Sequence, residues 1–222
     1  MSCRFYSGMT FLFVRSHLKI LRIFLILFLS VIISCSGDKS GELVEFHGRT
    51  MGTTYSVKVV DNILFGDETK KESLKTGIDG ILVQVNNKMS TWQKDSEISL
   101  FNSFKSTDWF QVSKDFVTVV NDARKISEVS DGAFDVTVGR LVNLWGFGPT
   151  IKEDNIPVDS EIEKAQELCD YRKLKTRVDE PAIKKEIPDM YVDLSSIAKG
   201  FGVDQVAEFL ENSGFCWMVP RC

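Results

Sequence analysis

The chain has 222 residues, 43% of them hydrophobic and 26% charged, which is typical of an ordinary globular domain and excludes a wholly disordered, collagen-like or coiled-coil protein. Its net charge of −4 is unevenly distributed: residues 1–34 hold four of the 27 basic residues and no acidic one, which leaves 23 basic against 31 acidic residues in the remainder. Because an acidic body repels phosphate backbones, we expect no nucleic-acid partner.

The N-terminus predicts export. Residues 23–33 read IFLILFLSVII, an apolar run shorter than the roughly 20 residues of a membrane span and typical of a secretory signal. Ile32-Ile33-Ser34-Cys35 resembles a bacterial lipobox, in which Cys35 is lipidated and becomes the first residue of the mature protein. We therefore expect a lipoprotein signal peptide over 1–34 and a lipid-anchored polar tether over 35–45. The alternative is an uncleaved anchor helix in which Cys35 is incidental.

The first half of the body predicts one strand and two helices. Alternating apolar and polar residues over 53–60 indicate a half-buried strand. Thr69 and Glu72 have the spacing of a capping box, and a helical stripe of apolar residues follows as far as Met89. Ser113 is expected to open the second helix, with a stop near Gly132.

The second half predicts further helices and strands in no regular βαβ order. Ser160 with Glu163 is expected to cap a third helix, and residues 171–178 and 190–194 read as strands. A last helix is predicted over 196–212. This mixture favours an α+β fold over a doubly wound parallel sheet.

Several common kinds of site find little support in the sequence. His47 is the one histidine after the signal, and no two cysteines have the C-x-x-C spacing, so the supply of zinc ligands is thin and a Ser-His-Asp triad is not indicated. The two commonest nucleotide-binding motifs, G-x-x-x-x-G-K-[ST] and G-x-G-x-x-G, are absent.

Three segments are unusual for plain scaffold, although each also has an ordinary interpretation. Residues 51–55 place a glycine and two hydroxyls before a strand, which is also a common way for a strand to start. Trp92 follows a predicted helix end, where it could stack on a ring system or plug the core. Residues 131–149 crowd glycines around aromatic residues and Asp135, as in a close backbone approach or a tightly packed loop.

A fourth segment, residues 190–200, reads as a strand, a turn and a helix start. Free N–H groups and the positive end of the helix dipole at 195–198 would favour an anion such as phosphate. Lys199 is disfavoured by that dipole unless an anion is bound, and Asp193 could help to hold a hard cation such as Mg²⁺. The ordinary interpretation is a serine N-cap with Lys199 in solvent.

Taken in order, these segments resemble the ApbE family, the FAD:protein FMN transferases, which are commonly periplasmic lipoproteins. The matching pieces are MGTTYSV (51–57), MSTWQKDSEISLFN (89–102), DGAFDVTVGRLVNLWGFGP (131–149) and VDLSSIAKGFGVDQVA (192–207). The resemblance implies an ApbE-like domain over 46–214 and Mg²⁺-dependent transfer of FMN from FAD to a threonine of a target protein, with release of AMP. It also implies a location in the bacterial cell envelope, anchored to the inner or outer membrane and facing the periplasm.

The resemblance also implies roles for single residues. The positions that match the FAD pocket are Met51, Trp92, Ala133, Phe134, Asp135, Asp193 and Lys199. Ser196 matches a position whose backbone carbonyl contacts the metal. No catalytic base is assigned. The family's usual acceptor proteins, subunits of membrane-bound redox pumps, are the implied partners besides FAD.

The chain departs from the family pattern at its end. Residues 215–222 do not read like the strand and glycine turn that follow in the family, so they are expected to be an atypical tail on an incomplete, impaired domain. The same site could instead hydrolyse FAD to FMN and AMP if water replaces threonine. It could also bind flavin without turnover, as a periplasmic binding lipoprotein.

Overall fold

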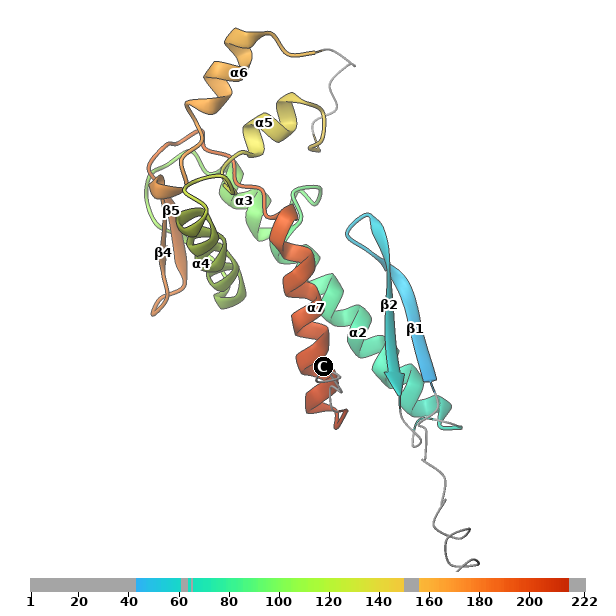
Figure 1. The fold of residues 1–222 in the computed structure, drawn as a ribbon. Coiled ribbons are helices and arrows are strands. Elements are labelled where there is room, and N and C mark those ends of the chain that lie inside the picture. The colour runs from blue at the N-terminus through green and yellow to red at the C-terminus, as the bar shows by residue number, and fades with distance from the viewer. Residues whose placement is uncertain (1–42, 61–63, 65, 150–155, 216–222) are drawn as a thin grey trace, which may run out of the picture. The chain divides into compact units, whose positions relative to one another are not determined.

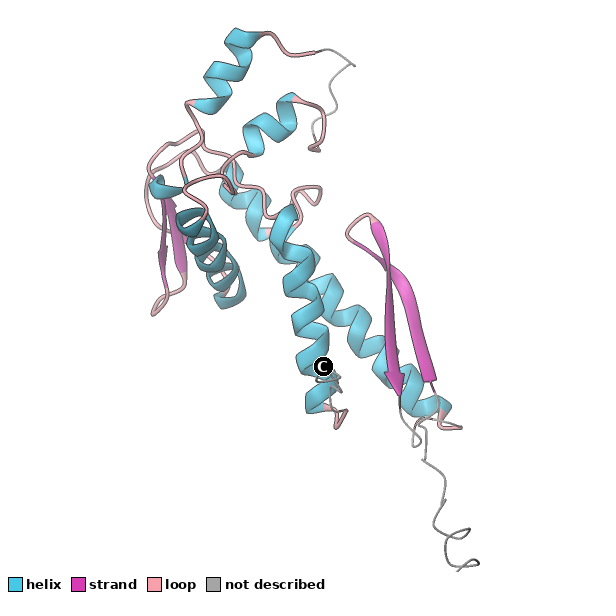
Figure 2. Cartoon of the chain, viewed as in Figure 1, coloured by secondary structure: helices cyan, strands magenta, loops and turns pink. Residues whose placement is uncertain are grey.

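The computed structural model describes residues 43–60, 64, 66–149 and 156–215 (Figure 1). The predicted signal peptide and Cys35 lie outside the described residues, so their processing stays a prediction. Among the helices that are described, none combines the length and apolar character needed to cross a bilayer. The elements are mostly helices with two small antiparallel sheets, which confirms the predicted α+β class (Figure 2).

The described chain begins with a β-hairpin. Strands β1 (Leu43–Thr50) and β2 (Thr53–Val60) are antiparallel and are joined by Met51 and Gly52 alone. Both turn residues have positive φ, 47° and 72°, as the primed two-residue turns that suit twisted strands require. The strand predicted over 53–60 is confirmed. Its partner β1 was not predicted, and it begins inside the segment 35–45 that was expected to be a tether.

Two long helices form the frame on which the hairpin lies. Helix α2 (Glu68–Met89) packs along α7 (Ser195–Asn212), close to the ranges predicted for both (Figure 1). A Cβ on Gly77 would meet the Phe209 ring, and a Cβ on Gly202 would lie 3.5 Å from a Leu82 methyl group. The start of one helix therefore faces the end of the other, and the pair is antiparallel.

The helix starts test the predicted caps. Ser113 opens α4 (Lys114–Val129) as expected, and its Oγ accepts the Phe116 N–H. The expected capping box at Thr69 is wrong because Asp67, two residues earlier, accepts the Lys70 N–H at 2.9 Å.

The expected Ser160 cap of the third helix is also wrong. Helix α6 (Asp159–Gln166) starts before that serine, and the Glu161 carboxylate reaches back to the Val158 N–H at 3.2 Å. Each start is thus set by a carboxylate one to two residues away from the expected hydroxyl. Carboxylates serve as well as hydroxyls at this end of a helix, so composition alone does not separate the candidates.

The second sheet has the order β3-β5-β4, with β3 (Phe110–Gln111), β5 (Ala182–Lys185) and β4 (Leu174–Arg177). The strand predicted over 171–178 is confirmed only in its centre, because it opens with the 3₁₀ turn Tyr171–Lys173. The strand predicted over 190–194 is wrong: Tyr191 forms one isolated bridge with Val138, and the neighbouring backbone groups bond elsewhere.

The buried apolar side chains form two clusters. One gathers the end of α2, the helices α3 (Glu97–Ser103) and α4, the second sheet, residues 190–194 and the start of α7; the other gathers the hairpin, the start of α2 and the end of α7. Both long helices therefore contribute to both clusters. Phe215, which was assigned to an atypical tail, is buried in the second cluster.

The lysine that ends β5, Lys185, is fully buried. Its Nζ donates to the carbonyls of Phe101, Asn102 and Met190 at 3.2, 3.5 and 3.3 Å. Two of these acceptors lie in the last turn of α3, where the helix dipole favours a cation, and the Phe101 carbonyl also accepts the Phe104 N–H at 3.1 Å. Burial, followed by the neighbouring charges of Lys105 and Arg140, lowers the pKa of Lys185 to about 8.

This buried lysine predicts a pH dependence of stability. Between the folded pKa of about 8 and the ordinary value of 10.5, the unfolded chain holds more protons than the folded one, so the free energy of unfolding rises with pH. Relative to Lys185→Met, the wild type should gain up to about 1.4 kcal/mol per pH unit in this window. Urea unfolding of both proteins at stepped pH measures the difference, with Lys184→Met as the control for charge removal. A difference that stays constant with pH would contradict the assignment.

Candidate functional site

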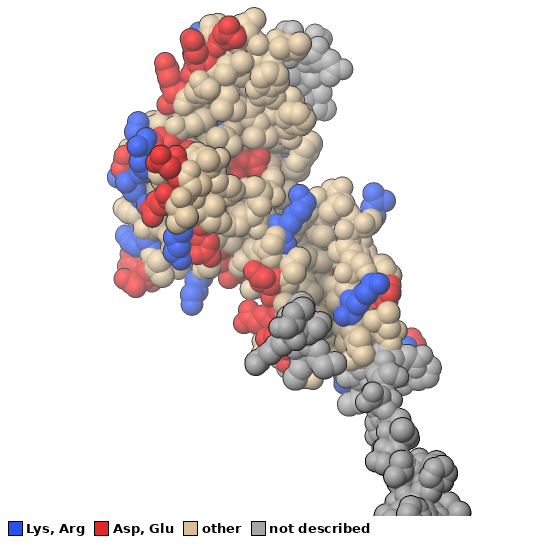
Figure 3. Space-filling view, in the orientation of Figure 1, with Lys and Arg blue, Asp and Glu red and all other residues tan. Residues whose placement is uncertain are grey.

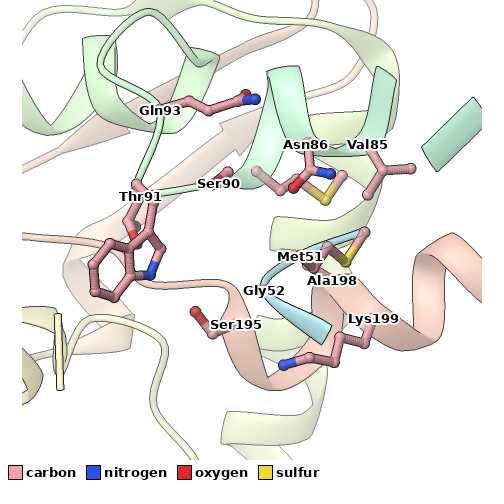
Figure 4. A pocket seen from close by; sticks show the side chains of 12 residues that line it. Met51, Gly52, Val85, Asn86, Ser90, Thr91, Gln93, Ser195, Ala198 and Lys199 are labelled. Carbon is pink, nitrogen blue, oxygen red and sulfur yellow. The ribbon is translucent and has the colours of Figure 1, made fainter. Parts of the chain in front are cut away.

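A cavity of about 610 Å³ opens where the hairpin turn, the end of α2 and the start of α7 meet (Figure 4). Its lining comes from three separate stretches of the chain: Met51, Gly52, Val85, Asn86, Met89, Ser90, Thr91, Trp92, Gln93, Ser195, Ala198 and Lys199. The volume falls in the range of sites for small organic ligands and cofactors. Apolar side chains from α2 and the turn mix with a few hydroxyls and one cation.

The hairpin turn forms the first wall. Met51 has a φ of 47°, in the left-handed region that costs a side-chain-bearing residue roughly 1–2 kcal/mol. Its side chain is half-buried against the first core cluster and lies close to Gly202 of α7. The Asn86 amide of α2 donates to Thr50 Oγ1 at 2.9 Å and ties the turn to the helix. Packing and this hydrogen bond hold the turn in a conformation that Met51 alone disfavours.

The loop after α2, residues 90–93, forms the second wall. Trp92 is 65% exposed, so it does not plug the core, and its ring is open to a ligand at the cavity. Oγ of Ser96, the N-cap of α3, lies 2.6 Å from Ser90 O and 2.9 Å from Gln93 O. The Gln93 Oε1 atom is buried and has no hydrogen-bond partner. An unpaired buried acceptor is costly, which makes it a group that a ligand donor would satisfy.

The start of α7 forms the third wall. Ser195 and Lys199 lie in its first turn and face the cavity from the same helix (Figure 4). The N-cap is Leu194, which has no capping side chain, so neither serine is the N-cap of the ordinary interpretation. Asp193 Oδ1 accepts the Ser195 N–H at 2.8 Å. Leu194 O accepts the Ile197 and Ala198 N–H groups, so of the free N–H groups expected over 195–198 the described structure leaves that of Ser196. The attraction for an anion at this wall therefore rests on the Ser196 N–H, the helix dipole and Lys199.

The segment Ala133-Phe134-Asp135 is not part of the cavity lining. Asp135 Oδ1 accepts the Thr137 N–H and Oγ–H, both at 2.7 Å, and Oδ2 accepts the Tyr171 N–H at 3.1 Å. In this structure the carboxylate stabilises its own loop and ties it to the backbone at Tyr171. The loop reaches the third wall through the backbone, since the Asp193 N–H donates to Val136 O at 2.8 Å.

Of the predicted site residues, the structure therefore brings Met51, Trp92 and Lys199 to one cavity. Asp193 and Ser196 flank the lining residue Ser195 along the chain. The polar lining residues Asn86 and Gln93 were not predicted from the sequence. Asn86 is a poor helix former near the end of a predicted helix, and Gln93 follows Trp92; these were the weak indications available.

Within the described ranges, no three His, Cys, Asp or Glu side chains gather in a way that could hold a metal ion. The Oδ1 atom of Asp193 is engaged with Ser195, and its second oxygen has no hydrogen bond in the described structure. Mg²⁺ in proteins is commonly held by one or two carboxylates together with waters and substrate phosphates. Asp193 and the Ser196 carbonyl fit a part of such a site.

Two other reactive side chains do not serve the cavity. Cys169 is half-buried and its Sγ–H donates to Ala165 O at 3.2 Å. Burial, and to a lesser extent Asp135, raises the pKa of its thiol to about 11, so the thiol is neutral and a weak nucleophile near pH 7. His47 lies on exposed β1 beside Glu45.

The surface charges are interspersed. On the face drawn in Figure 3, Lys and Arg lie among Asp and Glu, and many described pairs are within salt-bridge distance, such as Lys105 with Asp189 and Lys88 with Asp115. A phosphate ligand would therefore be attracted by the local groups of the cavity rather than by a broad positive field.

Comparison with known proteins matches this chain to one family throughout the described body. The sequence model of the ApbE family matches residues 51–219. The FAD:protein FMN transferase of Vibrio cholerae is 41% identical over 194 residues, covering 87% of this chain and 57% of that protein. The FAD:protein FMN transferase of Haemophilus influenzae is 44% identical over 179 residues, covering 79% and 51%.

Solved structures agree. The flavin transferase ApbE from Vibrio cholerae superposes with a TM-score of 0.74 at 43% identity, covering 79% of this chain and 55% of that one. The chain spans about half the length of the curated relatives that it matches.

The bonds of Asp135 predict a role in stability that needs no ligand. Asp135→Asn replaces one acceptor oxygen by an NH₂ group that faces backbone donors, which should cost about 1–3 kcal/mol of unfolding free energy. Chemical denaturation measures the loss. The control is Asp131→Asn, an exposed site with a φ of 50° where Asn is well tolerated. Equal denaturation midpoints for Asp135→Asn and the wild type would contradict the role.

Proposed function

Because the chain belongs to the ApbE family, we propose that it binds FAD in the cavity between Met51, Trp92 and Lys199 and acts in flavin transfer. The acceptor would be a threonine of a target protein, with FMN transferred and AMP released. The names of the relatives to which the chain is similar state transfer of FMN from FAD to a protein. The threonine and the AMP are what the family resemblance implies.

One observation carries the proposal. Three positions that the family resemblance marks for the FAD pocket come from three distant parts of the chain, a hairpin turn, a loop and a helix start. All three line the same cavity. Residues with purely structural roles in three distant parts of the chain would have no reason to line one cavity.

The chemistry of the cavity suits the two halves of a dinucleotide. The exposed Trp92 ring offers a face for stacking on a flat ring system. Lys199 and the first turn of α7 attract the pyrophosphate. The unpaired Gln93 Oε1 is an acceptor of the kind that a ring N–H or amino group satisfies. Ala133, Phe134 and Asp135 would complete the pocket from the neighbouring loop, as the family resemblance implies.

The proposed reaction is a phosphoryl transfer. The threonine hydroxyl oxygen bonds to the phosphorus on the FMN side of FAD, the bond from that phosphorus to the bridging oxygen breaks, the bridging oxygen leaves with AMP, and the hydroxyl proton passes to water. Such reactions depend mainly on positioning and on neutralising phosphate charge. Lys199 and the Ser196 N–H, which has no hydrogen bond in the described structure, would hold the phosphates in place.

The proposal includes Mg²⁺. When bound, the ion would neutralise phosphate charge, and Asp193 with the Ser196 carbonyl would hold it together with phosphate oxygens and water. The remaining residues act without it: Trp92 orients the ring system and Lys199 orients the pyrophosphate.

The proposed location is the bacterial cell envelope, where acylated Cys35 would anchor the body to the inner or outer membrane, facing the periplasm. The apolar run and the lipobox-like Ile32-Ile33-Ser34-Cys35 support it. Acceptor proteins in membrane redox pumps would lie within reach of such an anchor.

Incubation of the full chain with FAD, Mg²⁺ and a threonine-bearing acceptor protein tests the function. Covalent flavin fluorescence on the acceptor supports transfer. Release of AMP without labelling would instead favour hydrolysis, the second activity open to this site, and bound FAD with neither product would favour a binding lipoprotein. An absence of FAD binding would overturn the proposal.

In the same assay, Lys199→Met should weaken FAD affinity roughly tenfold or more, because a charged hydrogen bond to phosphate contributes about 1.5–3 kcal/mol. The matched control is Lys94→Met, an exposed lysine beside the second wall that does not line the cavity. Titration of flavin fluorescence gives both affinities. Equal losses for the two variants would point to net charge rather than to the α7 site.

The anchor is tested separately in cells. Cys35→Ala should release the protein from the membrane fraction, since a thioether-linked lipid cannot form on alanine, and Cys3→Ala serves as the control. Fractionation followed by immunoblotting reports the distribution. Membrane association that persists in Cys35→Ala would count against a lipid anchor.

A further inference from the structure

Helix α3 joins two walls of the cavity. At its start, Ser96 is 1% exposed and its Oγ lies within hydrogen-bond distance of the carbonyls of Ser90 and Gln93, the two ends of the second wall. Near its end, Asn102 faces the segment that leads into the third wall. The helix is short and its buried face belongs to the first core cluster. It therefore has a fixed contact with each wall.

The contact at the end of α3 is a paired one. Asn102 is 4% exposed; its Nδ2 donates to Val192 O and its Oδ1 accepts the Val192 N–H, both at 2.8 Å. Val192 is fully buried. One side-chain amide thus replaces the strand neighbour that this stretch of backbone lacks. Among side chains of this length, only an amide presents a donor and an acceptor together without a charge.

The paired backbone leads directly to the cavity. Asp193 follows Val192 and accepts the N–H of Ser195, the first residue of α7. Ser195 and Lys199 then line the cavity. The position of the α7 start relative to α3 is therefore set within a few residues of the Asn102 contact.

We infer that Asn102 is a positioning residue: its pairing with Val192 sets the distance between the wall that carries Trp92 and the wall that carries Lys199. It does not line the cavity and acts through the backbone of residues 192–195. That the ligand between these walls is FAD rests on the proposed function; the setting of the distance does not.

Other bonds keep the segment folded when this pair is lost. Lys185 Nζ donates to Met190 O at 3.3 Å, and the Gly139 N–H donates to Tyr191 O at 3.1 Å. A Cβ at Gly139 would lie 2.7 Å from that carbonyl oxygen, so the two backbones approach as closely as glycine allows. Loss of the Asn102 pair should thus shift the segment rather than unfold the protein.

Asn102→Asp is the informative change. Near pH 8 an ionised carboxylate keeps the acceptor for the Val192 N–H but turns a second acceptor toward Val192 O. When protonated, the carboxyl group regains a donor and the same shape. Burial raises the pKa of such a carboxyl group, whereas the ammonium of Lys185, which donates to the Phe101 and Asn102 carbonyls, lowers it, so the variant is followed from pH 8 to pH 5 and below. Lowering the pH should therefore restore the pairing with Val192 in this variant, whereas a general loss of stability would not be reversed by protonation.

The distance is measured without ligand. Spin labels on Lys94→Cys and Val203→Cys, both exposed positions, report the separation of the loop and α7 in a full chain whose 5 native cysteines are replaced by Ser. Asn102→Asp should broaden or shift the distance distribution at pH 8 and restore it as the pH falls to 5 and below. Leu174→Ala, a fully buried site that neither lines the cavity nor bonds to its walls, is the control for lost stability and should leave the distribution unchanged over the same pH range.

FAD affinity gives the second readout. Asn102→Asp should weaken FAD binding roughly tenfold at pH 8 relative to the wild type, and the gap should close as the pH falls to 5 and below. If the wild type binds no FAD, the proposed function fails while the label distances still decide the positioning role. If Asn102→Asp does not fold, Asn102→Leu in the same labelled chain replaces it. An unchanged distance distribution in a folded Asn102 variant would overturn the inference.

Discussion

The buried amide of Asn102, paired with both backbone groups of Val192, is the interaction on which the cavity depends most. Residues 190–194 have no ladder partner in the described structure beyond a single bridge, yet Met190, Val192 and Leu194 are fully buried. Buried backbone groups must be paired, and here a side chain, a lysine ammonium and a glycine-rich loop supply the partners. This irregular backbone leads into α7, whose first residue, Ser195, lines the cavity.

The same logic explains the other wall residues. Met51 occupies a left-handed turn position at a cost, and it stays there because the hairpin register, the Asn86 bond and the core beneath fix it. Trp92 remains exposed because its loop is held in place by Ser96, whose Oγ lies within hydrogen-bond distance of the carbonyls of Ser90 and Gln93. Met51, Trp92 and the start of α7 are thus each placed by a neighbouring polar side chain, Asn86, Ser96 and Asn102 respectively. Preorganisation of this kind reduces the entropy lost on binding.

The long, periodic elements and three of the cavity residues could be predicted from the sequence, whereas their supports could not. The stripe from Leu74 to Met89 predicted α2, but the choice between Asp67 and Thr69 as its cap depends on backbone geometry that composition does not contain. Residues 190–194 look like a strand because apolar Met190, Val192 and Leu194 alternate with Tyr191 and Asp193. Their long-range partner Asn102, 90 positions earlier, shows why they are not. Asp135 was expected to line the FAD pocket. In the structure its carboxylate accepts the N–H groups of Thr137 and Tyr171, so it stabilises the loop without a ligand.

Native-state hydrogen exchange at the Val192 amide tests this account most directly. Its N–H is donated to the Asn102 side chain rather than to a ladder, so its exchange requires the Asn102 pair to open. The account predicts that this amide exchanges only through global unfolding, as slowly as the buried core of α4. Exchange of the Val192 amide by local opening, while α4 amides such as that of Val120 stay protected, would contradict the claim that the pair fixes the start of α7.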